Sequence, residues 1–344
     1  MFSDYEYNKL ADRHSFVIKD TDLAIINSVR RIILTEIPVV GFYGEEEPTV
    51  EIIINNSPLH NEFMIHRVGL IPLYISEKIT DDYKDGDYVF ELNVENTGSN
   101  MINITTDHFT GTYKDTKLSK ADLDKIFPAN NITKQKILIS RLKAGEHLHL
   151  KATAIKRTAK INAAFSPVSL SNFFFMEDEK EAEKKDNILD KQRSYHKNEY
   201  GDPSKINFQI ESLNGLSYKY LFKKALDIII DKIETLNIKL TNKEIDIEEI
   251  QNCPKSFNFK IDDEDDTLGN LIQSIIHNKY IRKNSDKCSY VGYICPHPLI
   301  NQLIVRFTLS SENKDDFYKF FIENLKDIIK IIEKLRTDWN NFSK

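Results

Sequence analysis

The densest group of carboxylates in the chain lies between Asp262 and Asp266, where the sequence reads Asp-Asp-Glu-Asp-Asp. Clustered carboxylates can hold the divalent cations that nucleotidyl-transfer enzymes need, so one hypothesis is a metal-dependent enzyme. The same run precedes apolar residues at helical spacing. Acidic side chains at a helix start can cap it and complement its dipole, by about 0.3–1 kcal/mol each. We favour capping and keep the enzyme as the alternative.

Two other groups of residues have types that could do chemistry. His147 and His149 would share one face of a strand and, with Glu146, could bind zinc, but no third ligand follows at the usual spacing. Cys295 and His297 could act as nucleophile and base, but neighbouring prolines favour a turn and no acid is placed to orient the histidine. We therefore expect no catalytic residue and no cofactor on this chain.

Composition limits the class of protein. The chain has 344 residues, of which 40% are hydrophobic and 29% charged, which suggests two domains with ordinary cores. Cys253, Cys288 and Cys295 form no CxxC motif, and we see neither a secretory signal nor a membrane-spanning run. We expect an intracellular, reducing location. The net charge of −6, with basic and acidic residues interspersed, argues against a free-standing nucleic-acid-binding protein, which stays open as an alternative.

Hydrophobic periodicity predicts an α+β fold made of two similar units. Short β-type runs separated by polar turns predict a mostly β inserted domain, and a highly charged stretch at 176–203 predicts an exposed, mobile loop. The predicted boundaries are 1–45 and 155–240 for the first unit, 46–154 for the inserted domain, 241–255 for a linker and 256–344 for the second unit.

The two units share one plan. Each has a strand, then a helix with an acidic start and an Asn one turn in (Asn27 and Asn270), then a Val-Gly-aromatic strand start at Val40 and Val291, and a long apolar helix at its end. Because the helices are apolar on two faces, we predict that the units pair as a pseudo-two-fold dimer within the chain. Two unrelated domains that match by chance are the alternative. The predicted interface consists of Leu23, Ile26, Asn27, Ile33, Leu268, Asn270, Leu271, Ile272, Ile275, Phe321 and Ile328.

Several stretches resemble a known family. Residues 22–38 and, more closely, 56–73 resemble RNA polymerase alpha-type subunits, which include bacterial alpha, its archaeal D-type equivalent and the third-largest subunit of eukaryotic RNA polymerase II. Residues 156–167 resemble the family's segment after its inserted domain. Residues 262–271 and 291–299 are similar to the smaller partner, which is the L-type protein of archaea and the eleventh subunit of eukaryotes. The order of these motifs resembles a D-plus-L fusion, as in large DNA viruses of eukaryotes.

This resemblance implies a non-catalytic assembly platform that recruits the largest and second-largest polymerase subunits, which carry out the chemistry. A small zinc-bearing subunit would bind nearby, and DNA and RNA would be met only through the complex. It also implies a location in the host cytoplasm, at a virus factory, and in the virion, with the nucleus as an alternative. The residues expected to face the second-largest subunit are Arg30, Arg31, His66, Arg67, Leu70, Ile71 and Pro72.

The sequence departs from the family at two places. Residues 156–165 lack the glycines and the His-Ala-Lys motif that are usual there. The inserted domain has no cysteine, whereas some relatives bind metal through cysteines clustered in it, so we expect no metal site.

Arg30 and Arg31 could form a phosphate clamp in place of a partner contact, but adjacent helical residues point about 100° apart.

Overall fold

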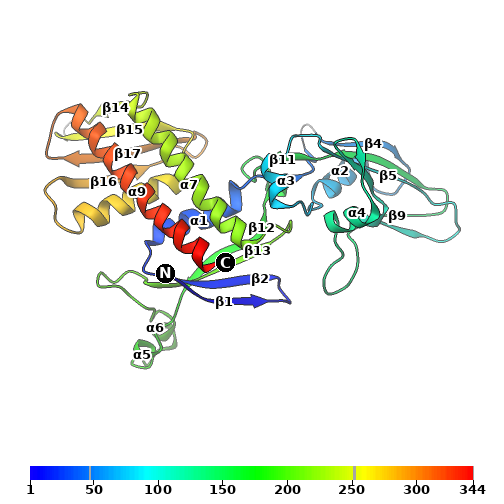
Figure 1. Cartoon of the computed structure of the whole chain (residues 1–344), viewed down its shortest axis with the longest axis horizontal. Helices are drawn as coiled ribbons and strands as arrows, with labels where there is room; N and C mark the ends of the chain where they lie inside the picture. The colour runs from blue at the N-terminus through cyan, green and yellow to red at the C-terminus, as the bar shows by residue number, and fades with distance from the viewer. Residues whose placement is uncertain (46–47, 251–252, 344) are drawn as a thin grey trace.

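A four-stranded antiparallel sheet and two helices form the first unit of the computed structural model, which describes residues 1–45, 48–250 and 253–343 (Figure 1). The sheet order is β1-β2-β13-β12. The strands are β1 (Phe2–Asn8), β2 (Arg13–Lys19), β12 (Val168–Phe175) and β13 (Lys205–Ser212), and the helices are α1 (Leu23–Thr35) and α7 (Tyr218–Thr241).

The second unit repeats this arrangement, with the sheet order β14-β15-β17-β16. In both sheets the second strand of the order leads into the shorter helix and the third leads into the long helix. The strands are β14 (Asp246–Glu249), β15 (Ser256–Asp262), β16 (Cys288–Ile294) and β17 (Gln302–Leu309). The helices are α8 (Asp266–Ile276), which continues as a π-helical turn η3 (His277–Ile281), and α9 (Lys314–Phe342).

One part of the predicted repeat is wrong. The Val-Gly-aromatic motif at Val291 lies in β16 of the second sheet, but Val40 lies in β3 (Val39–Gly41), which pairs with β11 (Ile155–Arg157) outside the first sheet. The strand that takes the place of β16 in the first sheet is β12. The two motifs therefore match in local sequence and not in position within the fold.

The inserted domain extends away from the two units (Figure 1). It has a five-stranded sheet of order β4-β10-β5-β7-β8, a two-stranded sheet β6-β9 and its own apolar core. Three short helices, α2, α3 and α4, accompany these strands. The elements are β4 (Val50–Asn55), α2 (Asn61–Gly69), α3 (Glu77–Asp82), β5 (Tyr88–Glu95), β6 (Ile102–Thr105), η1 (Thr106–His108), β7 (Thr110–Tyr113), β8 (Thr116–Lys117), α4 (Lys120–Ile126), β9 (Leu138–Leu142) and β10 (His147–Thr153). The chain returns from it through β11 and the short helix η2 (Ala163–Phe165).

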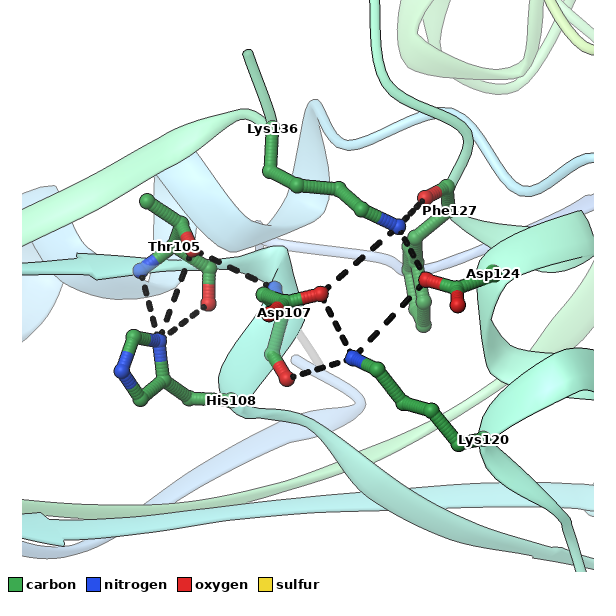
Figure 2. A network of polar contacts seen from close by, with 7 residues as sticks. All are labelled: Thr105, Asp107, His108, Lys120, Asp124, Phe127 and Lys136. Atoms are coloured by element: carbon green, nitrogen blue, oxygen red, sulfur yellow. Dashed lines mark hydrogen bonds and ion pairs between the residues drawn. The ribbon is translucent and has the colours of Figure 1, made fainter. Parts of the chain in front are cut away.

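A polar network ties the segment after α4 to the rest of the inserted domain (Figure 2). Lys136 Nζ lies 2.6 Å from both Asp124 Oδ1 and the carbonyl oxygen of Phe127. Lys120 Nζ lies 2.5 Å from Asp107 Oδ1, and Lys136 approaches the same oxygen at 3.8 Å. Two lysines thus bridge two carboxylates and one helix-end carbonyl.

Aspartate caps explain where the two shorter helices begin. Asp22 accepts a hydrogen bond from the backbone N–H of Ala24 at 2.8 Å, and Asp265 accepts one from that of Thr267 at 2.8 Å. The capping interpretation of the acidic run is thereby confirmed for Asp265. Each cap satisfies a backbone donor that has no partner within its own helix.

Two predicted irregular segments contain more structure than expected. The charged stretch at 176–203 is largely exposed, as predicted, but it is not without secondary structure, because it forms α5 (Glu179–Ala182), α6 (Ile188–Gln192) and two isolated β-bridges. The predicted linker at 241–255 contains β14, which pairs along the edge of β15. Three parts of the predicted organisation lie outside the described residues. They are residues 251 and 252 of that linker, 46 and 47 of the predicted inserted domain, and 344 of the second unit.

Candidate functional site: the interface between the two units

Helices α1 and α8 meet through polar contacts at both ends of their crossing. At one end, Ser274 Oγ lies 3.0 Å from both carboxylate oxygens of Asp22, and Asn278 Nδ2 donates to Asp22 Oδ2 at 2.7 Å. At the other end, Arg31 Nε donates to Thr267 Oγ1 at 2.8 Å, and the Arg31 guanidinium lies 3.8 Å from Asp265. These contacts join residues more than 200 positions apart in the sequence.

An ionic network surrounds the second of these contacts. Lys232 Nζ lies 3.0 Å from Glu36 Oε2 and 3.0 Å from Glu264 Oε2. Lys160 Nζ lies 2.9 Å from Glu36 Oε1 and 3.9 Å from Asp265 Oδ2. Sequence reasoning identified only the acidic run, because the other members come from the end of α1, the chain after β11 and the middle of α7.

Burial and charge act in opposite directions on these groups. Burial alone would lower the pKa of Lys232, but the carboxylates of Glu264 and Glu36 raise it above its ordinary value. Burial raises the pKa of Glu264 against the attraction of Lys232. Burial also opposes ionisation of Asp265, but hydrogen bonds from Thr267 and nearby cations leave its pKa below the usual range. Lys232 therefore stays charged at neutral pH, and its ammonium group bridges the carboxylates of Glu36 and Glu264.

The long helices α7 and α9 form a second contact and lie side by side (Figure 1). Trp339 of α9 is fully buried, and its ring centroid lies 4.3 Å from that of Phe222 and 4.8 Å from that of Phe16 in the first unit. Its indole Nε1 donates to the carbonyl oxygen of Lys219 at 3.0 Å. The end of the second unit thus packs into the aromatic core of the first.

Most of the predicted interface residues belong to the apolar core that both units share. Leu23, Asn27 and Asn270 are half-buried, and Asn27 accepts a hydrogen bond from Arg30 Nε at 2.9 Å within α1. Phe321 packs on its own sheet, with ring centroids 5.1 Å from Phe259 and 4.9 Å from Phe307. The fully or nearly buried members are Ile26, Ile33, Leu268, Leu271, Ile272, Ile275, Phe321 and Ile328.

The residues expected to face the second-largest subunit are divided between two parts of the fold. Arg30 and Arg31 lie half-buried on α1 of the first unit, whereas the others lie in or just after α2 of the inserted domain. Leu70 is 55% exposed, but Ile71 is only 4% exposed and belongs to the inserted core. The expectation that Ile71 presents its side chain to a partner is therefore wrong. His66 is exposed, and Pro72 is half-buried.

Two of these arginines are engaged within the chain. Arg67 donates from Nε to the carbonyl oxygen of Ile139 at 3.0 Å and from Nη2 to that of Leu138 at 2.9 Å, which ties α2 to β9. Arg31 contacts the second unit as described above. Arg30 has its pKa lowered, first by burial and then by Arg31 beside it, and no carboxylate pairs with it in the described ranges.

A polar contact between α3 and α7 orients the inserted domain on the first unit. Ser217, the cap of α7, donates to Glu77 Oε1 from its hydroxyl at 2.5 Å and from its backbone N–H at 3.2 Å. Further along both helices, Asp81 Oδ1 lies 2.9 Å from Tyr220 Oη and 2.8 Å from Lys224 Nζ. We name this contact among five side chains the α3–α7 latch.

The other candidate groups make ordinary structural contacts. His147 pairs with Asn93 at 2.7 Å, and His149 pairs with Glu91 at 2.6 Å, both across to β5. Cys295 lies 3.6 Å from Asp266. Within residues 1–45, 48–250 and 253–343, no cluster of three or more His, Cys, Asp or Glu is placed to hold a metal ion. In the same ranges no helix combines the length and apolarity needed to cross a bilayer.

Two sheet-and-helix units that share one core through their helices define a dimerisation module. The chain belongs to the RNA polymerase Rpb3/Rpb11 dimerisation domain family, whose models match residues 15–233 and residues 256–338. The first match contains the inserted domain, and the second covers most of the second unit.

Named relatives agree with this family. The chain is 29% identical over 182 residues to subunit 3 of DNA-directed RNA polymerases II, IV and V of Arabidopsis thaliana, covering 48% of this chain and 54% of the relative. It is 27% identical over 175 residues to subunit RPAC1 of RNA polymerases I and III of Homo sapiens, covering 46% and 49%. A shorter match to RNA polymerase II subunit RPB3 of Schizosaccharomyces pombe is 47% identical over 58 residues, covering 17% and 18%. The two longer matches span about half of each relative.

Proposed function

We propose that this chain is a non-catalytic assembly subunit of a multisubunit DNA-directed RNA polymerase, in which two dimerisation domains are fused and pair with each other about a pseudo-two-fold axis. The observation that carries the proposal is the presence of two domains of this family in one chain, with the same strand order and one common core. The three relatives named above are all RNA polymerase subunits, which supports the proposal.

The proposed partners are the largest and second-largest polymerase subunits, with a small zinc-bearing subunit nearby. The surface that suits such a partner best is the turn after α2, where Leu70 is 55% exposed beside exposed His66. Burial of an exposed leucine by a partner stabilises the complex, by about 1.5–3 kcal/mol when the side chain is fully buried. The α3–α7 latch supports the proposal because it holds this turn in one orientation relative to α1.

The biological setting belongs to the same proposal. A D-plus-L fusion favours a large DNA virus of eukaryotes as the source, with the polymerase in the host cytoplasm, at a virus factory, and in the virion, or in the nucleus. Contact with DNA and RNA would run through the assembled enzyme. A net charge of −6 and the pairing of Arg31, Lys160 and Lys232 with carboxylates fit a chain that does not grip nucleic acid itself.

Purification of the tagged chain from its native source, followed by mass spectrometry of the intact complex, tests the proposal. We expect two chains, each above about 100 kDa and so well beyond a single domain, in equal ratio to this one. The Leu70→Asp variant should recover less of the second-largest subunit. Leu189→Asp, at a leucine of similar exposure (58%) on α6, should recover as much as the unchanged chain. Elution of the chain alone at 40.0 kDa in gentle salt would overturn the proposal.

A further inference from the structure

Charge is divided unequally between the two sides of the network at the interface. The first unit supplies Arg31, Lys160, Lys232 and Glu36, and the second unit supplies Glu264 and Asp265. The first unit's share is therefore three cations and one anion, and the second unit's share is two anions. The charges balance only when the two shares meet.

These charges lie where imbalance is costly. The side chains of Glu36, Glu264 and Lys232 are only 9%, 16% and 17% exposed. Removing one partner of a buried ion pair leaves a charge that has lost its hydration without compensation, which is far more costly than losing a surface pair. The network therefore penalises any pairing of surfaces that fails to match its charges.

Equivalent positions in the two units carry different residues. The N-cap of α8 is Asp265, and the residue before it is Glu264. The N-cap of α1 is Asp22, and the residue before it is Thr21. Nine positions after the cap, α1 has Arg31 and α8 has Ser274. If two first units paired, Lys232 would meet Thr21 in place of Glu264, and one positive charge would be left over at each end. If two second units paired, Glu264 and Asp265 would meet Ser274 in place of Arg31.

We infer that this network makes the first unit select the second unit as its partner over a copy of itself, so that the chain closes on itself instead of linking to other chains through like units. Electrostatic selection of this kind works by making the wrong pairing unfavourable as well as the right one favourable. The inference depends on the pairing of the two units and not on the binding of polymerase subunits, so it can fail while the proposed function stands.

Refolding the full chain tests the selection directly. A protease site is inserted after the exposed Cys253, the chain is refolded by dilution from urea, and it is then cleaved and examined by native mass spectrometry. Unlike pairing gives complexes of one N-terminal with one C-terminal fragment. Like pairing gives complexes of two N-terminal or two C-terminal fragments, which differ in mass. We expect the unchanged chain to give unlike complexes at every protein concentration.

Two single variants unbalance the network, and their combination restores the balance. Lys232→Glu and Glu264→Lys should each lower the ratio of unlike to like complexes about tenfold, and Lys232→Glu/Glu264→Lys should recover most of it, because coupled charges in contact are not additive. Lys223→Glu, the same change at an exposed lysine of α7, is the matched control and should behave like the unchanged chain. A merely structural role for Lys232 would not produce recovery in the double variant.

The opposite result is equally definite. If Lys232→Glu keeps the unlike pairing of the unchanged chain, or if the double variant pairs no better than the single variants, the inference is wrong. Should the single variants not fold, the double variant and a salt series on the unchanged chain decide. At 1 M salt the Debye length falls to about 3 Å, which screens these charges while the units are still apart and hydrated, so like complexes should increase during refolding. Their complete absence at both low and high salt would reject the selection.

Discussion

The hydroxyl of Ser274 lies 3.0 Å from both carboxylate oxygens of Asp22, the residue that caps α1. Ser274 stands nine positions after Asp265, the cap of α8, and Arg31 stands nine positions after Asp22. In each helix, the ninth residue after the cap contacts the cap of the other helix: Ser274 contacts Asp22, and Arg31 contacts Asp265. This reciprocity is what a two-fold relation between two similar helices requires, and it supports the proposed pseudo-dimer.

Asp22 thus has two roles that substitution can separate. Asp22→Ala should lower the free energy of unfolding by about 2–3 kcal/mol, of which the lost cap accounts for about 1 kcal/mol. Asp22→Asn keeps a side-chain oxygen for the cap and should cost less. Urea unfolding of Asp22→Ala, Ser274→Ala and the double variant gives their coupling, which we expect at about 0.5–1 kcal/mol. Strictly additive effects would show that the contact does not join the helices.

Local signals explain what the sequence predicted correctly. An acidic residue before an apolar run predicted the starts of α1 and α8, and helical apolar spacing predicted the long helices α7 and α9 at the ends of the two units. These signals depend on neighbours within one or two turns. They also made the paired helices recognisable, because apolar residues on two faces require two partners.

Long-range arrangements were not predictable in this way. Glu36, Lys160 and Lys232 reach Glu264 of the acidic run only after the end of α1, the chain after β11 and the middle of α7 have packed against the start of α8. Nothing in the local sequence of these three residues distinguishes them from surface charges. The edge strands β1 and β14 are largely exposed and lack a buried apolar run, and each has one unpaired edge. The burial of Ile71 depends on how the chain turns after α2, and residue type does not reveal it.

The single tryptophan of the chain allows the contact between the units to be measured. Trp339 is fully buried against Phe222 and Phe16, so Trp339→Ala should lower the free energy of unfolding by about 3–5 kcal/mol, and Trp339→Phe by less. Ile331→Ala, at a residue 42% exposed on the same helix, is the control and should cost little. Equal losses from Trp339→Ala and Ile331→Ala would contradict the packing.

Fluorescence of Trp339 also reports whether the units unfold together. Because one apolar core spans both units, the fluorescence transition in urea should coincide with the loss of helical circular dichroism from α1, α7, α8 and α9. An earlier fluorescence transition would mean that α9 leaves the first unit before either unit unfolds.

The α3–α7 latch should make stability depend on pH through Asp81. Burial opposes ionisation of this carboxyl, but hydrogen bonds from Lys224 and Tyr220 hold its pKa below the ordinary range. A lowered folded-state pKa contributes stability that is fully present above the unfolded pKa of about 3.9 and is lost as the pH falls through the folded value. Asp81→Asn should therefore cost about 0.5–1 kcal/mol at pH 7, and the difference should shrink at the acid end.

Urea unfolding between pH 7 and pH 3 measures this difference. Asp82→Asn, at an exposed neighbouring aspartate, is the matched control and should follow the unchanged chain at every pH. If Asp81→Asn and Asp82→Asn were indistinguishable at pH 7, the contacts of Asp81 would contribute nothing to stability, and only the Ser217–Glu77 contact of the latch would be left to orient the inserted domain.

Lys136 should stabilise the inserted domain alone. Its ammonium lies 2.6 Å from both Asp124 and the Phe127 carbonyl oxygen and is 17% exposed, so Lys136→Met removes charge-assisted hydrogen bonds worth about 1–3 kcal/mol (Figure 2). The inserted core and the shared core are separate, so we expect faster amide hydrogen exchange in residues 127–142 and unchanged exchange in α1 and α8. Lys125→Met, at a side chain 79% exposed, should change neither. Faster exchange in α1 after Lys136→Met would show instead that the two cores unfold as one unit.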